Sequence, residues 1–145
     1  SDDKLARAAD LGADATINYK DNPDWGKQAF EAAGAGVNLV IEIGGGGTFN
    51  QSMEALTIGG HISIIGALSG VATELNLLSM VFKNVHTHGI TVGTREDHEA
   101  MNQFFSEHQI HPIIDKEVSF EEGAEAIIGI ASGNHFGKIV VNINN

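Results

Sequence analysis

Along the chain, segments whose apolar residues have helical spacing alternate with segments whose apolar residues have strand spacing. An apolar stripe near the N-terminus predicts a short amphipathic helix that begins at Ser1 or Asp2 and stops at Gly12; its members are Leu5, Ala8, Ala9 and Leu11. Polar and apolar residues alternate from Asp14 to Tyr19, which predicts a short strand. A second helix is expected from about Pro23 to Ala33.

The middle of the chain repeats a unit of strand, glycine turn and helix. Val37 to Ile43 is nearly continuous in β-branched residues, which predicts a strand at the centre of a parallel sheet, covered on both faces. Gly44 to Gly47 follow, and then a helix with Met53, Leu56 and Ile58 on one face. The unit recurs as a strand, a glycine-rich loop and a helix over His61 to Ile65, Gly66 to Gly70 and Leu75 to Phe82.

The same alternation continues to the end of the chain. The expected elements are a strand at Val85 to Val92, a helix at Glu96 to His108, an extended segment at His111 to Phe120, a helix at Glu121 to Ala131 and a strand at Ile139 to Ile143. Met101, Phe104 and Phe105 are expected to face inward on the first of these two helices, and Ala124, Ile127 and Ile128 share one face of the second. Such alternation predicts a single α/β domain over residues 1–145, with a ligand crevice beyond the carboxyl ends of the strands.

The net charge and the composition limit the kinds of molecule that the chain is expected to bind. The formal net charge is −11, and no cluster of Lys and Arg exists to neutralise a phosphate backbone, so nucleic acid is excluded. Backbone N–H groups at a helix start still allow a small anionic ligand. Because the sequence has no cysteine, it predicts no disulfide and no thiolate metal site, which fits the cytoplasm. No apolar run reaches the ~20 residues of a membrane span.

Three stretches in the right order carry a resemblance to a known family. They are Lys-Leu-Ala-Arg-Ala-Ala-Asp-Leu-Gly-Ala-Asp with Ile-Asn-Tyr-Lys, then Gly-Gly-His-Ile-Ser-Ile-Ile-Gly, and then His-Phe-Gly-Lys-Ile-Val-Val. The chain resembles the medium-chain dehydrogenases/reductases, namely the zinc-type alcohol dehydrogenases and quinone oxidoreductases. The resemblance implies an incomplete Rossmann-like, doubly wound parallel sheet that lacks its first βαβ segment. It also implies an NAD(P) cofactor and an enzyme that transfers a hydride between nicotinamide and an alcohol, carbonyl or quinone.

The start of the chain agrees with this resemblance, because it opens on a helix-capping pattern and not on an initiator Met. We therefore expect a piece of a larger enzyme, inactive by itself, whose catalytic domain and any catalytic zinc lie elsewhere. Gly44 to Gly47 is not the family's phosphate-binding fingerprint, since Phe49 stands where a third glycine is needed. The resemblance makes it the later turn, over which the ribose and nicotinamide lie.

The resemblance also implies a set of cofactor-binding residues. Lys4 and Tyr19 match positions near the 2′-phosphate in relatives that use NADP, although a solvated lysine and a half-buried tyrosine explain them equally well. They favour NADP slightly over NAD. The residues expected to line the crevice mainly through backbone groups are Ile43, Gly44, Gly45, Ile65, Gly66, Ala67, Leu68, Thr91, Val92 and Gly93.

Three further positions complete the predicted site. Arg95 follows a strand and can reach a phosphate or the substrate, although an ion pair with Glu96 or Glu99 is the commoner role for such an arginine. Asn134 and Lys138 flank the last glycine turn. No catalytic residue is assigned.

The histidines do not make a metal site in this reading. Alternation places His86 and His88 on one strand face, but no spacing matches that of zinc ligands, and scattered surface histidines are the better explanation.

Two other functions stay open. One is a stand-alone, non-catalytic nucleotide-binding or regulatory module. The other is an assembly domain, in which the strand at Val85 to Val92 pairs edge to edge with its mate in a homodimer.

Overall fold

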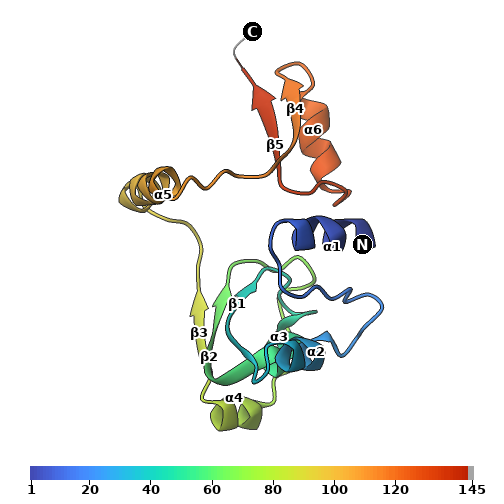
Figure 1. The fold of residues 1–145 in the computed structure, drawn as a ribbon, viewed down its shortest axis with the longest axis vertical. Helices are drawn as coiled ribbons and strands as arrows, with labels where there is room; N and C mark the ends of the chain where they lie inside the picture. Colours follow the sequence, from blue (N-terminus) through green and yellow to red (C-terminus); the bar gives the residue numbers. More distant parts are fainter. Residues whose placement is uncertain (144–145) are drawn as a thin grey trace. The chain divides into compact units, whose positions relative to one another are not determined.

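The computed structural model describes residues 1–143 and divides the chain into two compact units, Ser1–Val92 and Gly93–Asn145 (Figure 1). Each unit is taken by itself. The first unit contains, in chain order, α1 (Asp2–Asp10), α2 (Trp25–Ala32), β1 (Val37–Glu42), α3 (Phe49–Ala55), β2 (Leu56–Ile64), α4 (Leu77–Lys83) and β3 (His86–Gly89).

The sheet of the first unit is parallel, with strand order β1-β2-β3. β2 is the central strand, so the prediction that Val37 to Ile43 lies at the centre is wrong among the described residues. β1 forms an edge, and its Leu39 and Ile41 are more than half exposed, so it is not covered on both faces either. The continuous apolar run identified a parallel strand but not its place in the sheet.

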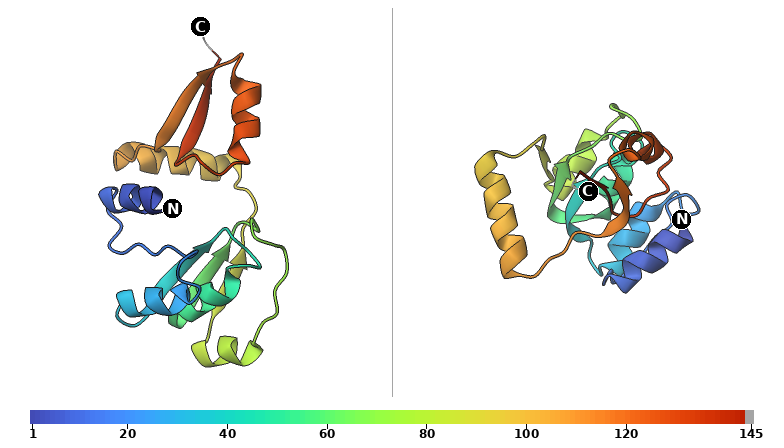
Figure 2. Two further views of the ribbon diagram at one scale, coloured as in Figure 1. Left: turned by 90° about the vertical axis from the view of Figure 1, so that its right-hand side faces the viewer. Right: turned by 90° about the horizontal axis from the view of Figure 1, so that it is seen from above.

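The core lies between one face of this sheet and helix α3. It is formed by Phe49, Met53, Leu56 and Ile62, with Val40 and Met80 among the partly buried residues around it. Figure 2 shows α2 and α3 next to each other beside the sheet. Gly26 permits this contact, because a Cβ at this position would lie 2.1 Å from the carbonyl oxygen of Gln51.

Two predicted elements of the first unit are wrong. Residues 14–19 form no strand: no described strand pairs with them, and the carbonyl of Asn18 instead accepts from the N–H groups of Asp21 and Asn22 in a local turn. Leu56 and Ile58 belong to β2 and not to the preceding helix, which ends at Ala55. The first residues of β2 contain a register shift opposite β1, and Gly59 has a φ of 77° there.

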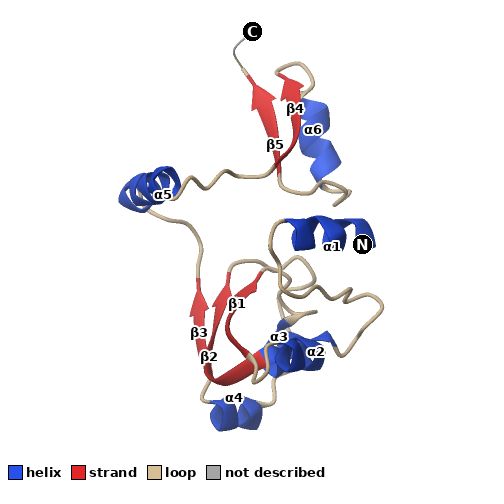
Figure 3. Ribbon diagram, in the orientation of Figure 1, coloured by secondary structure: helices blue, strands red, loops and turns tan. Residues whose placement is uncertain are grey.

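The second unit is a βαβ arrangement preceded by a helix. It contains α5 (Arg95–Glu107), β4 (Ile114–Ser119), α6 (Gly123–Ile130) and β5 (Lys138–Asn142). β4 and β5 pair in parallel, and α6 connects them (Figure 3). Within residues 1–143 all strand pairs are therefore parallel, as predicted, but these strands form two small sheets and not one.

The helix faces predicted for the second unit are wrong within it. Met101 and Phe104 are exposed on α5, and only Phe105 is partly buried. On α6 the buried residue is Gly123, where a Cβ would lie 3.2 Å from Val141, whereas Ala124, Ile127 and Ile128 are exposed. Apolar spacing predicted the helices but not the side on which each one packs.

Candidate cofactor site

Two glycine-rich loops meet at the carboxyl ends of β1 and β2. The turn at residues 44–48 follows β1, and the loop at residues 65–72 follows β2. The N–H of Gly46 donates to the carbonyl of Gly70 at 2.7 Å, and the N–H of Ser69 donates to the carbonyl of Gly44 at 2.7 Å. The two loops are thus fixed to each other where an open parallel sheet binds its ligand.

Close packing of these loops accounts for their glycines. A Cβ on Gly44 would lie 2.2 Å from the hydroxyl of Thr48, and one on Gly66 would lie 2.6 Å from the carbonyl oxygen of Ile43. Gly45 has a φ of 82°, and a Cβ there would lie 2.5 Å from the carbonyl oxygen of Gly70. The protein itself therefore demands glycine at these positions, in addition to any demand from a ligand.

The carboxylate of Glu42 accepts hydrogen bonds from several groups of the turn. Its Oε1 accepts from the N–H of Gly44 at 2.7 Å, from the N–H of Gly45 at 2.9 Å and from the hydroxyl of Thr48 at 2.6 Å. Its Oε2 accepts from the hydroxyl of Ser52, and the residue is 3% exposed. Burial raises the pKa of Glu42, but the hydrogen bonds from Ser52, Thr48, Gly45 and Gly44 together outweigh it and leave the pKa below its ordinary value. The carboxylate is ionised at neutral pH.

Two cavities open at these loops. One has a volume of about 480 Å³, and among its lining residues are Tyr19, Ile43, Gly44 and Leu68. The other has a volume of about 340 Å³ and includes Gly45, Gly66 and Ala67 in its lining. Seven of the predicted cofactor residues thus lie around these two cavities.

The other predicted residues of the first unit do not line either cavity. Lys4 lies on α1, Ile65 donates its N–H to the carbonyl of Glu42 at 2.8 Å, and Thr91 and Val92 follow β3.

The second unit contains the remaining four predicted positions. Gly93 precedes α5, and Arg95 begins that helix, where its Nε lies 2.7 Å from Glu99 Oε1 in an exposed i,i+4 pair. Asn134 lines a cavity of about 420 Å³ in this unit, and Lys138 begins β5.

Sequence reasoning missed the polar residues that support the turn, namely Glu42, Thr48 and Ser52. A signal was present: a single carboxylate ends an apolar strand, only Ile43 separates it from four glycines, and two hydroxyl residues follow the glycines. Trp25 was also missed, although it lines the same cavity as Tyr19.

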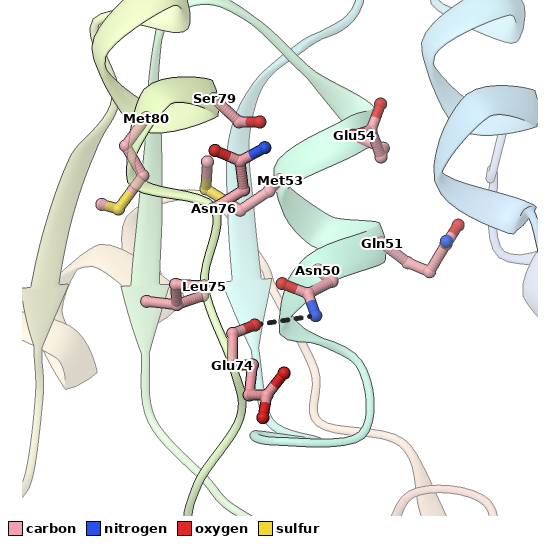
Figure 4. A pocket seen from close by; sticks show the side chains of 9 residues that line it. All are labelled: Asn50, Gln51, Met53, Glu54, Glu74, Leu75, Asn76, Ser79 and Met80. Carbon is pink, nitrogen blue, oxygen red and sulfur yellow. Dashed lines mark hydrogen bonds between the residues drawn. The ribbon is translucent and has the colours of Figure 1, made fainter.

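A further cavity contains none of the predicted residues. It lies between α3 and the segment Glu74 to Met80, has a volume of about 540 Å³ and is bordered by polar side chains that include Asn50 and Asn76 (Figure 4). Asn50 donates to the carbonyl of Glu74 at 3.2 Å across one end of it.

Residues 1–143 contain no group of three or more His, Cys, Asp or Glu side chains arranged to hold a metal ion. His61, His86 and His88 do gather on one sheet face, but their rings stack, with centroids 4.6 Å apart for His61 and His86. The described residues therefore do not fit a zinc ion.

None of the helices in residues 1–143 combines the length and hydropathy needed to cross a membrane.

Parallel strands joined by helices, with glycine loops packed at the carboxyl ends, define the class of open α/β proteins that bind ligands at that edge. The sequence pattern of the zinc-binding dehydrogenases matches residues 1–107, and the chain belongs to this family. A zinc-type alcohol dehydrogenase-like protein of Schizosaccharomyces pombe is 38% identical over 99% of the chain and 43% of its own length.

Solved structures agree with this assignment. A crystal structure of an NAD-dependent alcohol dehydrogenase matches with a TM-score of 0.87 and 30% identity, covering 99% of this chain and 42% of the other. A mycobacterial structure complexed with NADPH has the same fold, with a TM-score of 0.79, 19% identity and coverage of 99% and 47%. The predicted family and Rossmann-like α/β fold are confirmed. The chain spans less than half of the length of each of these proteins.

Proposed function

We propose that this chain supplies the part of an NAD(P)-binding crevice that receives the ribose and nicotinamide of the cofactor. The observation that carries the proposal is the pair of cavities at the carboxyl ends of β1 and β2, around which seven predicted cofactor residues gather. Their walls are mainly apolar side chains and glycine backbone, which suits the flat nicotinamide ring and its ribose better than a phosphate.

In the intact enzyme the bound nicotinamide supplies the hydride chemistry, between an alcohol and a carbonyl compound or with a quinone. The residues of this chain orient the ring: Ile43 and Leu68 form apolar walls, and Gly44 and Gly66 keep the backbone close. Since no catalytic group is assigned among the described residues, we expect no dehydrogenase turnover from the 145-residue chain alone. Turnover above a buffer control, with the purified chain and an alcohol or quinone, would contradict this.

NADP is the slightly preferred cofactor in this proposal. The resemblance matches Lys4 and Tyr19 with positions near the 2′-phosphate in relatives that use NADP, and an ammonium and a phenol both suit that group. The predicted cofactor contacts also still include Ile65, Thr91, Val92, Gly93, Arg95, Asn134 and Lys138.

The cytoplasm stays the predicted compartment, because a chain without cysteine has no need of oxidising surroundings.

The test is a titration of the 145-residue chain with NADH and with NADPH, in which changes in the amide chemical shifts report binding. Ala67→Asp places a charge in the smaller cavity, whereas Ala100→Asp makes the same change on the exposed surface of α5. We expect the first variant alone to weaken binding of both nucleotides. Equal binding by both variants, or shifts that avoid both cavities, would place the cofactor elsewhere. Tyr19→Phe should weaken NADPH more than NADH.

A further inference from the structure

The donors of the Gly44–Gly47 turn are already used inside the protein. The N–H groups of Gly44 and Gly45 donate to Glu42 Oε1, and the N–H of Gly46 donates to the carbonyl of Gly70. In a phosphate-binding loop these are the groups that hold the anion. Here three of the four glycine N–H groups have internal acceptors, and two of these groups share a carboxylate.

The carboxylate is also held in its charged form and kept from water. Two hydroxyl groups, from Thr48 and Ser52, donate to it in addition to the two backbone groups, and the residue is 3% exposed. A phosphate placed against this turn would have to displace these hydrogen bonds. It would also lie close to a negative charge in a region of low dielectric constant, where repulsion between like charges is strong.

We propose that Glu42 is a positioning residue that acts as the internal anion of this turn, so that the turn accepts a nucleoside portion of the cofactor that carries no phosphate and rejects phosphate itself. The proposal rests on the proposed function and adds a rule for which end of the dinucleotide lies here. Glu42 does this through the backbone of Gly44 and Gly45, which face the two cavities.

The experiment follows the amide signals of Gly44 and Gly45 in the 145-residue chain during titration with inorganic pyrophosphate or with reduced nicotinamide riboside, whose dihydropyridine ring is uncharged; this probe is called the riboside below. We expect the riboside to move both signals and pyrophosphate to leave them in place. Glu42→Gln keeps the shape but removes the charge, and it should weaken the riboside response about tenfold, the effect of one charge-assisted hydrogen bond. Glu54→Gln, on the exposed side of α3, is the matched control and should respond as the wild type does.

A pH series separates this role from general support of the fold. The riboside affinity of the wild type should fall as acid protonates Glu42, whereas the affinity of Glu42→Gln should stay flat over the same range. If Glu42→Gln does not fold, Ser52→Ala keeps the charge, removes one donor and should shift the acid limb of the profile to higher pH. Movement of the two signals by pyrophosphate in the wild type, or equal riboside affinity in Glu42→Gln and Glu54→Gln, would overturn the proposal.

Hydrogen exchange distinguishes a failure of this proposal from a failure of the proposed function. If neither riboside nor NADH moves any amide signal of the wild type, the proposed function is wrong. The positioning role of Glu42 in the turn then stands if Glu42→Gln, and not Glu54→Gln, speeds the exchange of the Gly44 and Gly45 amides. It is overturned if the two variants exchange alike.

Discussion

Glu42 is the residue whose ionisation has the clearest consequence for stability. Its folded pKa lies below its ordinary value of 4.5, so the ionised carboxylate adds stability that is present above that value and is lost as the pH falls through the folded pKa. We expect Glu42→Gln to lower the free energy of unfolding by about 1–3 kcal/mol at neutral pH, because four donors lose a charged acceptor.

Urea unfolding followed by Trp25 fluorescence at several pH values measures this effect. The free energy of unfolding should fall more steeply below about pH 4.5 in the wild type than in Glu42→Gln. Asp97 and Glu122 also have lowered pKa values, chiefly through hydrogen bonds from Thr94 and Ser119, and they act in the same direction in both proteins. Parallel acid limbs would contradict the assignment to Glu42.

Lys83 is a second single residue that we expect to matter for stability. Its Nζ donates to the carbonyls of Met53, Glu54 and Leu56 at 2.8–3.0 Å, which satisfies the carboxyl end of α3. Lys83→Met should destabilise the chain by about 1–3 kcal/mol, because it leaves partly buried carbonyls unsatisfied. Lys27→Met is the control, since the exposed pair of Lys27 with Glu31 at 4.0 Å should contribute at most about 0.5 kcal/mol. Equal denaturation midpoints would show that water replaces the ammonium without loss.

At the scale of elements, two helical glycines make opposite predictions for the same substitution. Gly26→Ala should destabilise by about 1–3 kcal/mol, because the new Cβ would overlap the backbone of Gln51 and force α2 away from α3. Gly129→Ala in α6 meets nothing within 4 Å and should stabilise by about 0.5–1 kcal/mol through helix propensity. Thermal unfolding of the two variants checks both signs, and a loss of stability in both would refute the packing argument.

The elements that could be predicted are those whose signals are local. α1 ends at Asp10, close to Gly12, which was expected to stop it, and Thr94 with Asp97 forms the capping box that starts α5. The strand expected at residues 14–19 failed because a strand needs a partner, and alternation alone cannot supply one. Leu56 and Ile58 were assigned to a helix because a short apolar run has no unambiguous period.

Seven of the predicted cofactor residues lie around the two cavities at the glycine loops, because parallel strands followed by glycines bring these residues to one edge of the sheet. Their role as cofactor contacts stays a prediction. The role of Glu42 was missed because the sequence signal shows a carboxylate near glycines but not its acceptor role, which depends on Thr48 and Ser52 lying close to the end of β1 in the folded chain. For Arg95 the sequence offered a cofactor or substrate contact and an ion pair with Glu96 or Glu99. The structure contains the ion pair with Glu99, which is the commoner role for such an arginine.

At the scale of the whole molecule, the exposed edge of β3 bears on assembly. Among the described residues β3 pairs only with β2, so one edge of it carries N–H and C=O groups without a strand partner. We retain the prediction of a homodimer formed through this edge. Light scattering should give twice the mass of the chain for the wild type and a lower mass for Thr87→Lys, which places a charge on the edge strand. Thr57→Lys is the control on the central strand. A monomer for the wild type would contradict edge pairing.

The prediction of one domain over residues 1–145 can be tested by unfolding. Trp25, the only tryptophan, reports on the first unit, whereas far-ultraviolet circular dichroism reports on the helices of both units. A single cooperative domain requires the two signals to change at the same denaturant concentration. In the second unit only Val118 and Gly123 are buried among the described residues, which is a small core for a segment that would have to fold alone. We therefore expect coincident transitions, and a helical signal that declines before the Trp25 signal would show two domains of unequal stability.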